Sequence, residues 1–303
     1  MDFRPVFTLT PLLLRQIKAV ERVAGFLEAV ELHKAWSDEL RQHVRVEDAL
    51  SSLQIEGSSL TLEEAFGLAR DREREVDRDS EREFLNYLLA FEAIDGYRGE
   101  RGARVGAAEI LNLHRVLVRG VRGGDRFAGR FRVEPVQVGD RVGGEVVVHH
   151  APPPWTEVEG EVDALVRWIA AVKEIPSRRH VERGGGDPWV HPVIVAGIAQ
   201  HRLVWIHPFI DGNGRTARML TAMLLYQRGY DFKYLFDLST YYNKDRDKYY
   251  EALRTVDRSG DYTRWLEYFL GGFSYQLVKI KQGAIKAAAG LAIGGDDDAE
   301  AMD

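Results

Sequence analysis

The chain has 303 residues, 45% of them hydrophobic and 29% charged, which is ordinary for a globular protein of one large or two smaller domains. Its net charge of −6 argues against a nucleic-acid partner, and the absence of cysteine excludes disulfides, thiolate catalysis and cysteine-ligated zinc. Neither a signal peptide nor an apolar run of about eighteen residues is present, so we expect a cytoplasmic protein without a membrane partner.

The N-terminal third of the chain predicts helices. Apolar residues recur at helical spacing between residues 12 and 27, after a possible capping residue and first-turn proline, Thr10-Pro11. A second amphipathic segment covers residues 32–46. A third covers residues 47–57, where Gly57 is suited to end the helix. Ser52 and Glu56 are one turn apart in it, so the serine hydroxyl is expected to hold the carboxylate.

Further helices are predicted downstream, and one segment breaks the pattern. Thr61 is a candidate cap for the next helix, and residues 84–97 and 109–118 follow with apolar periodicity. Between residues 131 and 149 the period changes, because β-branched residues surround a glycine-rich turn at residues 139–144. We therefore predict a β-hairpin there, within an otherwise helical protein.

The most informative segment lies between two apolar helical runs, residues 191–206 and 219–226. It runs His-Pro-Phe-Ile-Asp-Gly-Asn-Gly-Arg-Thr-Ala-Arg over residues 207–218. Glycines let backbone N–H groups approach a ligand, and a helix that begins there adds its positive dipole end, which favours phosphate. Arg215 and Arg218 share one face of that helix. Asp211 suits a bridging Mg²⁺, and His207 can accept a proton near neutral pH.

This segment resembles the signature of the Fic family, His-Pro-Phe-x-Asp-Gly-Asn-Gly-Arg-x-x-Arg, at every fixed position. The resemblance implies Mg²⁺-dependent transfer of AMP from ATP to a serine, threonine or tyrosine of a target protein, which can include the chain itself. It implies that His207 is the general base and that Asp211 holds Mg²⁺. The implied phosphate contacts come from the loop and the following helix: Gly212, Asn213, Gly214, Arg215 and Arg218.

Three other segments are similar to parts of Fic proteins. Residues 52–57, with Ser52, Glu56 and Gly57, resemble the inhibitory motif Ser/Thr-x-x-x-Glu-Gly/Asn of members that carry it in an N-terminal helix. The implied brake is a pair between Glu56 and Arg218. The hairpin resembles the Fic flap, which docks the target, and Val138 aligns with its clamp. Tyr249 and Tyr250 resemble residues that wall the adenine pocket, whereas Asp257 stands where some relatives have a base-contacting asparagine.

The expected fold is mainly α-helical, a Fic-type helical bundle with a β-hairpin flap. We expect three parts: an N-terminal helical region (1–104) with the inhibitory motif (52–57), a core (105–275) with the flap (131–150), and a helix end with an acidic, disordered tail (276–303). Some relatives also remove AMP from the target. Three points stay open: a different nucleotide donor, a nucleotide-regulated binding module without catalysis, and a homodimer.

Overall fold

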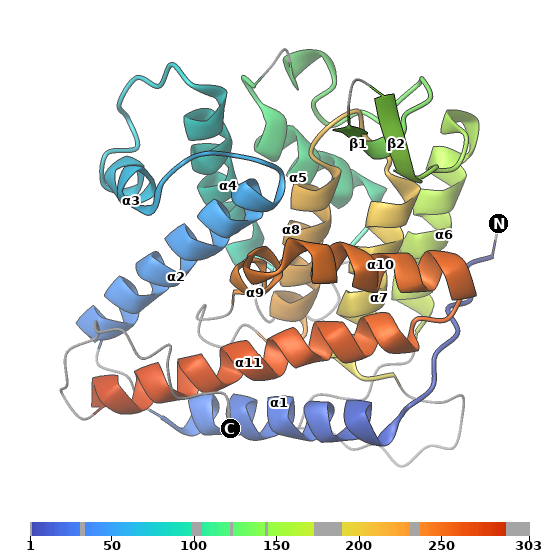
Figure 1. The fold of residues 1–303 in the computed structure, drawn as a ribbon. Coiled ribbons are helices and arrows are strands. Elements are labelled where there is room, and N and C mark those ends of the chain that lie inside the picture. Colours follow the sequence, from blue (N-terminus) through green and yellow to red (C-terminus); the bar gives the residue numbers. More distant parts are fainter. Residues whose placement is uncertain are drawn as a thin grey trace.

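The computed structural model describes residues 2–30, 34–97, 105–121, 124–142, 145–172, 190–230 and 237–288. These residues are mainly helical, as predicted, with one two-stranded sheet (Figure 1). The elements are α1 (Pro11–Ala29), α2 (Lys34–Ile55), α3 (Leu62–Arg70), α4 (Asp79–Asp95), α5 (Ala107–Val118), β1 (Val138–Val142), β2 (Glu145–His150), α6 (Val158–Ala171), α7 (Pro192–Ile206), α8 (Asn213–Gln227), α9 (Ser239–Lys244), α10 (Arg246–Ser259) and α11 (Thr263–Ala288).

Helix α7 forms the centre of the bundle. Its residues are apolar on every side and most are buried, as is expected of a helix surrounded by others. Helices α8 and α6 pack beside it, and α11 crosses it closely at Gly197, where a Cβ atom would lie 2.8 Å from the Phe269 ring. The Trp265 indole donates to the Gly197 carbonyl at 2.7 Å. This close packing fixes α7 against α11, and the candidate site follows the C-terminal end of α7.

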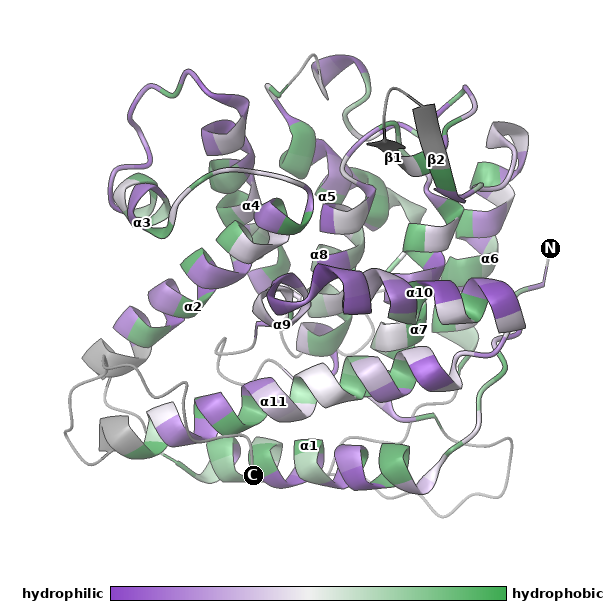
Figure 2. Ribbon diagram, in the orientation of Figure 1, coloured by the Kyte–Doolittle hydropathy of each residue, from purple (hydrophilic) through white to green (hydrophobic). Residues whose placement is uncertain are grey.

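Helices α1 and α11 run side by side in the same direction along one edge of the molecule (Figure 1). Figure 2 shows hydrophobic and hydrophilic residues alternating along both helices, as amphipathic helices require. Thr10 caps α1 through Leu13 N–H, and Thr61 caps α3 in a capping box with Glu64, so both predicted caps are confirmed. None of the described helices is long and apolar enough to cross a membrane.

One expected boundary differs in the structure. Residues 34–55 form one continuous helix, α2, because the apolar face continues through Val46, Leu50 and Leu53, which are all buried. Gly57, with φ of 92°, follows its end as predicted. Helix α11 runs through residue 275 into the part 276–303, where a helix end is expected. The division into parts 1–104, 105–275 and 276–303 stays a proposal, and residues 289–303 lie outside the described residues.

The predicted hairpin is present, but its first strand begins at Val138, later than residue 131, where the change in period begins. Strands β1 and β2 pair antiparallel, with an irregular register between Val138 and Gly139. Residues before Val138 do not extend the strand because their backbone is bound elsewhere: Arg132 N–H donates to the Pro208 carbonyl at 2.9 Å. The hairpin is therefore joined at its base to the segment that carries the Fic-like signature.

Candidate active site

The signature segment forms a loop, residues 207–214, which we call the motif loop. Helix α7 ends at Ile206, and the next residue, His207, has a left-handed backbone (φ 50°, ψ 58°); Gly212 is also left-handed (φ 78°) just before α8 begins. Among the described residues, His207 is the only non-glycine residue with positive φ. Such strain costs about 1–3 kcal/mol and is typical of functional sites. The two left-handed residues bring His207 and the first turn of α8 to one end of the bundle.

His207 is suited to act as a base. Burial lowers the pKa of its imidazole to about 4, and the Val204 carbonyl opposes this shift in part. The ring is therefore neutral at physiological pH, with a lone pair that can accept a proton.

Asn213 holds the motif loop together from within. Its side-chain oxygen accepts from Phe209 N–H, and its side-chain nitrogen donates to the Phe209 carbonyl, both at 2.9 Å. The side chain is buried and both ends of its amide are used in these bonds. The resemblance implied that this side chain binds phosphate, whereas in the structure it holds the loop together.

Arg218 projects from the second turn of α8 to the end of α2. Its side chain is 3% exposed, and its Nη2 donates to Glu56 Oε1 at 2.8 Å and to the Ser52 carbonyl at 3.0 Å. The expected pair of Glu56 with Arg218 is thus present in the structure. Burial disfavours the charge, but the attraction of Glu56 leads the opposing causes, and the pKa of Arg218 is raised.

Ser52 makes a different bond from the one expected. Its hydroxyl accepts from Arg218 Nε at 2.8 Å, so it holds the arginine and not the Glu56 carboxylate. The physical reason is that Arg218 enters between the two residues and offers two N–H groups along the face of α2. Three oxygens, two from Ser52 in α2 and one from Glu56 just beyond its end, therefore bind a single buried guanidinium.

The Glu56 carboxylate also lies over the N-terminal turn of α8. A Cβ atom on Gly214 would lie 2.2 Å from Glu56 Oε1 and 3.0 Å from Arg218 Nη1, so only glycine leaves room for both. A helix N-terminus attracts anions through its N–H groups and its dipole. Glu56 thus occupies a position that an anionic ligand of this turn would need.

Arg215 is buried below the loop between two carboxylates. Its Nη1 lies 3.0 Å from Glu83 Oε1 of α4, and its Nη2 lies 3.1 Å from Asp211 Oδ2. The Asp211 side chain is 60% exposed, and one exposed carboxylate beside a phosphate site fits the needs of Mg²⁺, which takes one or two carboxylates plus phosphate oxygens. Within the described part of the chain, no three His, Asp or Glu side chains gather into a ready-made metal site.

Arg132 connects the base of the hairpin to the motif loop. This buried side chain donates from Nε to the His207 carbonyl at 2.8 Å, and to the Glu134 and Pro153 carbonyls. The hairpin is held at a second point, because the His150 ring contacts the Trp205 carbonyl at 2.8 Å. Val138 is the strand partner of His150, so it lies across from a residue tied to the end of α7.

The two tyrosines predicted at the base pocket differ in accessibility. Tyr249 is buried and stacks on Tyr242, with ring centroids 4.4 Å apart. Tyr250 is 37% exposed, and its hydroxyl donates to the Ile55 carbonyl at 3.3 Å, beside Glu56. Of the two, only Tyr250 has a surface that a nucleotide base could cover. Asp257 lies near the end of β2, where its Oδ2 is 3.6 Å from His150 Nδ1.

Three residues of this site were not predicted from the sequence. Glu83 lies in a mixed-charge run, and nothing there distinguishes the buried acid from its exposed neighbours. Arg132 lies within the segment that resembles the flap, residues 131–150, but the resemblance gives it no role of its own. His114 packs under the motif loop and did have a signal, because it is a polar residue on the apolar face of the predicted helix 109–118.

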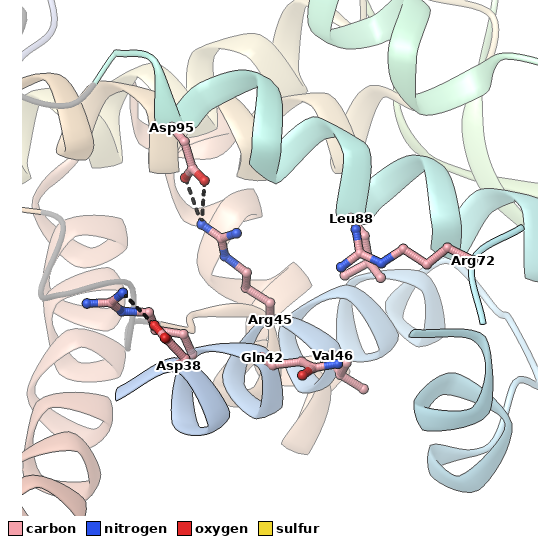
Figure 3. A pocket seen from close by; sticks show the side chains of 8 residues that line it. Asp38, Gln42, Arg45, Val46, Arg72, Leu88 and Asp95 are labelled. Carbon is pink, nitrogen blue, oxygen red and sulfur yellow. Dashed lines mark hydrogen bonds and ion pairs between the residues drawn. The ribbon is translucent and has the colours of Figure 1, made fainter. Parts of the chain in front are cut away.

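A separate cavity of about 530 Å³ lies between α2 and α4 and shares no lining residue with the site (Figure 3). Three arginines line it. Arg45 contacts both oxygens of Asp95, at 2.7 and 2.9 Å, and Arg41 contacts Asp38 at 3.2 Å. The third, Arg72, pairs with Glu92. Because each guanidinium faces a carboxylate, we assign this cavity no ligand.

Comparisons with known proteins point to the same family as the signature segment. Residues 105–225 match the model of the Fic/DOC family. A curated relative, protein adenylyltransferase Fic of Drosophila erecta, is 27% identical over 247 residues, which cover 80% of this chain. The chain spans only 43% of the length of that relative.

Solved structures show the same fold. A Fic family protein from Desulfovibrio desulfuricans superposes with a TM-score of 0.74 over 96% of this chain and 87% of its own, at 22% identity. A Fic domain containing signaling protein from Bacteroides thetaiotaomicron gives 0.69 over 92% of this chain and 100% of its own, also at 22% identity. The predicted Fic-type bundle is confirmed, and residues 105–225 of this chain form a Fic/DOC family domain.

Proposed function

We propose that this protein transfers AMP from ATP to a hydroxyl side chain of a target protein, and that Glu56 inhibits the transfer. The observation that carries the proposal is the joint position of a neutral histidine, a helix N-terminus and two buried arginines around one loop. Relatives named protein adenylyltransferase support the choice of reaction.

The chemical step follows from the position of His207. The target hydroxyl attacks the α-phosphorus of ATP, a new O–P bond forms, and the bond to the pyrophosphate oxygen breaks. His207 takes the hydroxyl proton as the attack proceeds, which its lowered pKa permits at neutral pH. A buried, fixed imidazole also avoids the entropic cost of orienting a base in solution.

Charge on the phosphates is stabilised by groups that are already in place. Glu56 Oε1 lies beside Gly214 in the first turn of α8, where backbone N–H groups are available to an anion, and Arg218 lies beside it. We assign Arg218 to the γ-phosphate and Arg215 to the β-phosphate and the leaving pyrophosphate. Arg215 Nε has no hydrogen-bond partner within the described residues, so this buried cation has capacity for an anion.

Asp211 is the residue that would hold Mg²⁺. The ion, when bound, would offset negative charge on the α- and β-phosphates. Asn213 contributes by fastening the loop, and Gly212 and Gly214 by leaving the backbone accessible. Val138 is the proposed clamp for the target segment, and Tyr250 is the better placed of the two tyrosines for the base.

Inhibition follows from competition for Arg218. While Glu56 pairs with Arg218 and covers the α8 N-terminus, an ATP γ-phosphate cannot use either, and the α-phosphorus is not presented to His207. A misplacement of about 1 Å can lower the rate by roughly a hundredfold. The same carboxylate could direct water at an AMP-modified target, so removal of AMP is a second activity to test.

The proposal is tested by intact-protein mass spectrometry. Wild type, Glu56→Gly and Glu56→Gly/His207→Ala are incubated with Mg²⁺ and each nucleoside triphosphate in turn. We expect addition of one AMP with ATP alone, most in Glu56→Gly and none in the double variant. Adducts from another triphosphate would change the donor. Nucleotide binding without any adduct, on the chain or on proteins of a host lysate, would favour the binding-module alternative.

A further inference from the structure

His114, which no part of the signature includes, is bonded at both ring nitrogens. The Gly129 N–H donates to its Nδ1 at 3.0 Å, so Nδ1 carries no proton. Its Nε2 must then carry the proton and donate to the Asp211 carbonyl, 3.1 Å away. Burial lowers the pKa of His114 to about 4, which agrees with this neutral tautomer. One ring thus joins the segment before the hairpin to the motif loop.

The same ring supports the loop by stacking. His114 and Phe209 lie parallel, with centroids 3.7 Å apart and planes within 4°. Asn213 holds Phe209 by its backbone on both sides, so the stack reaches the start of α8. Gly212 approaches so closely that a Cβ atom there would lie 2.9 Å from Val118 and 3.5 Å from His114.

The loop needs such support because no protein side chain packs against one side of it. A cavity of about 240 Å³ is lined by seven residues: His114, Val118, Val121, Gly124, Phe127, Ile210 and Asp211. Side chains that line a cavity have fewer packing partners within the protein on that side. Without the bond from His114, the Ile210–Asp211 peptide would be free to move toward this cavity, and the Asp211 carboxylate would move with it.

We propose that His114 is a positioning residue: its N–H bond to the Asp211 carbonyl fixes the metal-side end of the motif loop relative to His207. Arg132 fixes the other end through the His207 and Pro208 carbonyls. Both supports involve the segment that leads into the hairpin. Gly129 is bonded to His114, whose ring bonds to the loop, and Arg132 bonds to the loop directly. The catalytic role of the loop rests on the proposed function, whereas the positioning of the loop by His114 does not depend on it.

The test uses three variants in the Glu56→Gly background. His114→Phe keeps the stack and loses both bonds. His114→Gln keeps a donor toward Asp211, and His114→Asn keeps an acceptor toward Gly129. Asn112→Ala, on the exposed side of the same helix, is the control. We expect kcat for AMP transfer to fall at least about tenfold in His114→Phe and His114→Asn, with KM for ATP changed less than about threefold. His114→Gln should stay within about threefold of its parent.

Hydrogen exchange gives a second measurement that needs no activity. Amides in peptides spanning 208–214 should exchange faster in His114→Phe than in His114→Gln or Asn112→Ala, at a temperature well below each Tm. Equal kcat in the Phe and Gln variants, or unchanged exchange in the Phe variant, would overturn the proposal. If no variant transfers AMP, the proposed function fails, and the exchange data alone still decide whether His114 holds the loop.

Discussion

Replacing Glu56 by glutamine keeps the size of the side chain and removes its charge. The variant tests whether the carboxylate competes with phosphate for Arg218. In the structure Glu56 Oε1 lies 2.8 Å from Arg218 Nη2, and the two hydrogen bonds that this arginine donates to Ser52 do not depend on Glu56. Arg218 should therefore stay in place in Glu56→Gln and become available to the γ-phosphate.

The size of the effect follows from that contact. A hydrogen bond to a charged group contributes about 1.5–3 kcal/mol. The Glu56 side chain is 39% exposed, so water screens it and the lower end of the range applies. Since about 1.4 kcal/mol corresponds to a factor of ten, ATP affinity should rise by about tenfold.

Isothermal titration calorimetry of ATP with Mg²⁺ measures this change directly. The control is Glu63→Gln, which removes the same charge from an exposed position at the start of α3. The reasoning is refuted if Glu56→Gln binds ATP within about twofold of wild type, or if Glu63→Gln gives the same increase. An increase restricted to Glu56→Gln, and smaller at high salt, would support competition at Arg218.

Three further predictions concern buried titratable side chains. Glu83→Gln removes the main partner of buried Arg215 and should lower the free energy of unfolding by about 3 kcal/mol in urea denaturation; a loss below about 1 kcal/mol would contradict the buried pair. Asp237 lies against Asp48, and burial followed by repulsion from Asp48 raises its pKa well above the usual value. The folded protein therefore keeps a proton that the unfolded chain releases above about pH 4, so stability falls as pH rises from there toward the raised pKa; Asp237→Asn should flatten this slope above about pH 4, and parallel curves would refute it. Because the pKa of His207 is about 4, transfer by Glu56→Gly should be insensitive to His207 protonation near neutral pH and fall only toward that value; a loss centred near pH 6.5 would contradict its burial.

Much of the fold could be predicted because the signals are local. Helix caps such as Thr10 and Thr61 act on N–H groups two or three residues away, so a short stretch of sequence contains both partners. The hairpin was visible from its change in period. Its first strand was predicted too early because the sequence does not show that the backbone near Arg132 bonds to the motif loop.

The site was predicted less completely, since its residues come from helices far apart in the chain. The pair of Glu56 with Arg218 was expected only through resemblance to a family. The bond from Arg218 to the Ser52 hydroxyl depends on how α8 crosses α2, which no local pattern encodes. Glu83 could not be recognised among similar charges, because its burial comes from packing between α4 and α8.

The end of α2 determines how easily the contact between Glu56 and Arg218, which we propose to be inhibitory, can open. Glu56 lies one residue beyond the last helical residue, in a turn closed by bonds from Gly57 N–H to the Gln54 carbonyl at 3.0 Å and from Ser58 N–H to the Leu53 carbonyl at 3.1 Å. Fraying of this turn would withdraw the carboxylate while the rest of α2 keeps its packing, and helix ends are where local unfolding costs least. An activator would then need to supply only the free energy of breaking a few backbone hydrogen bonds, not that of moving a domain.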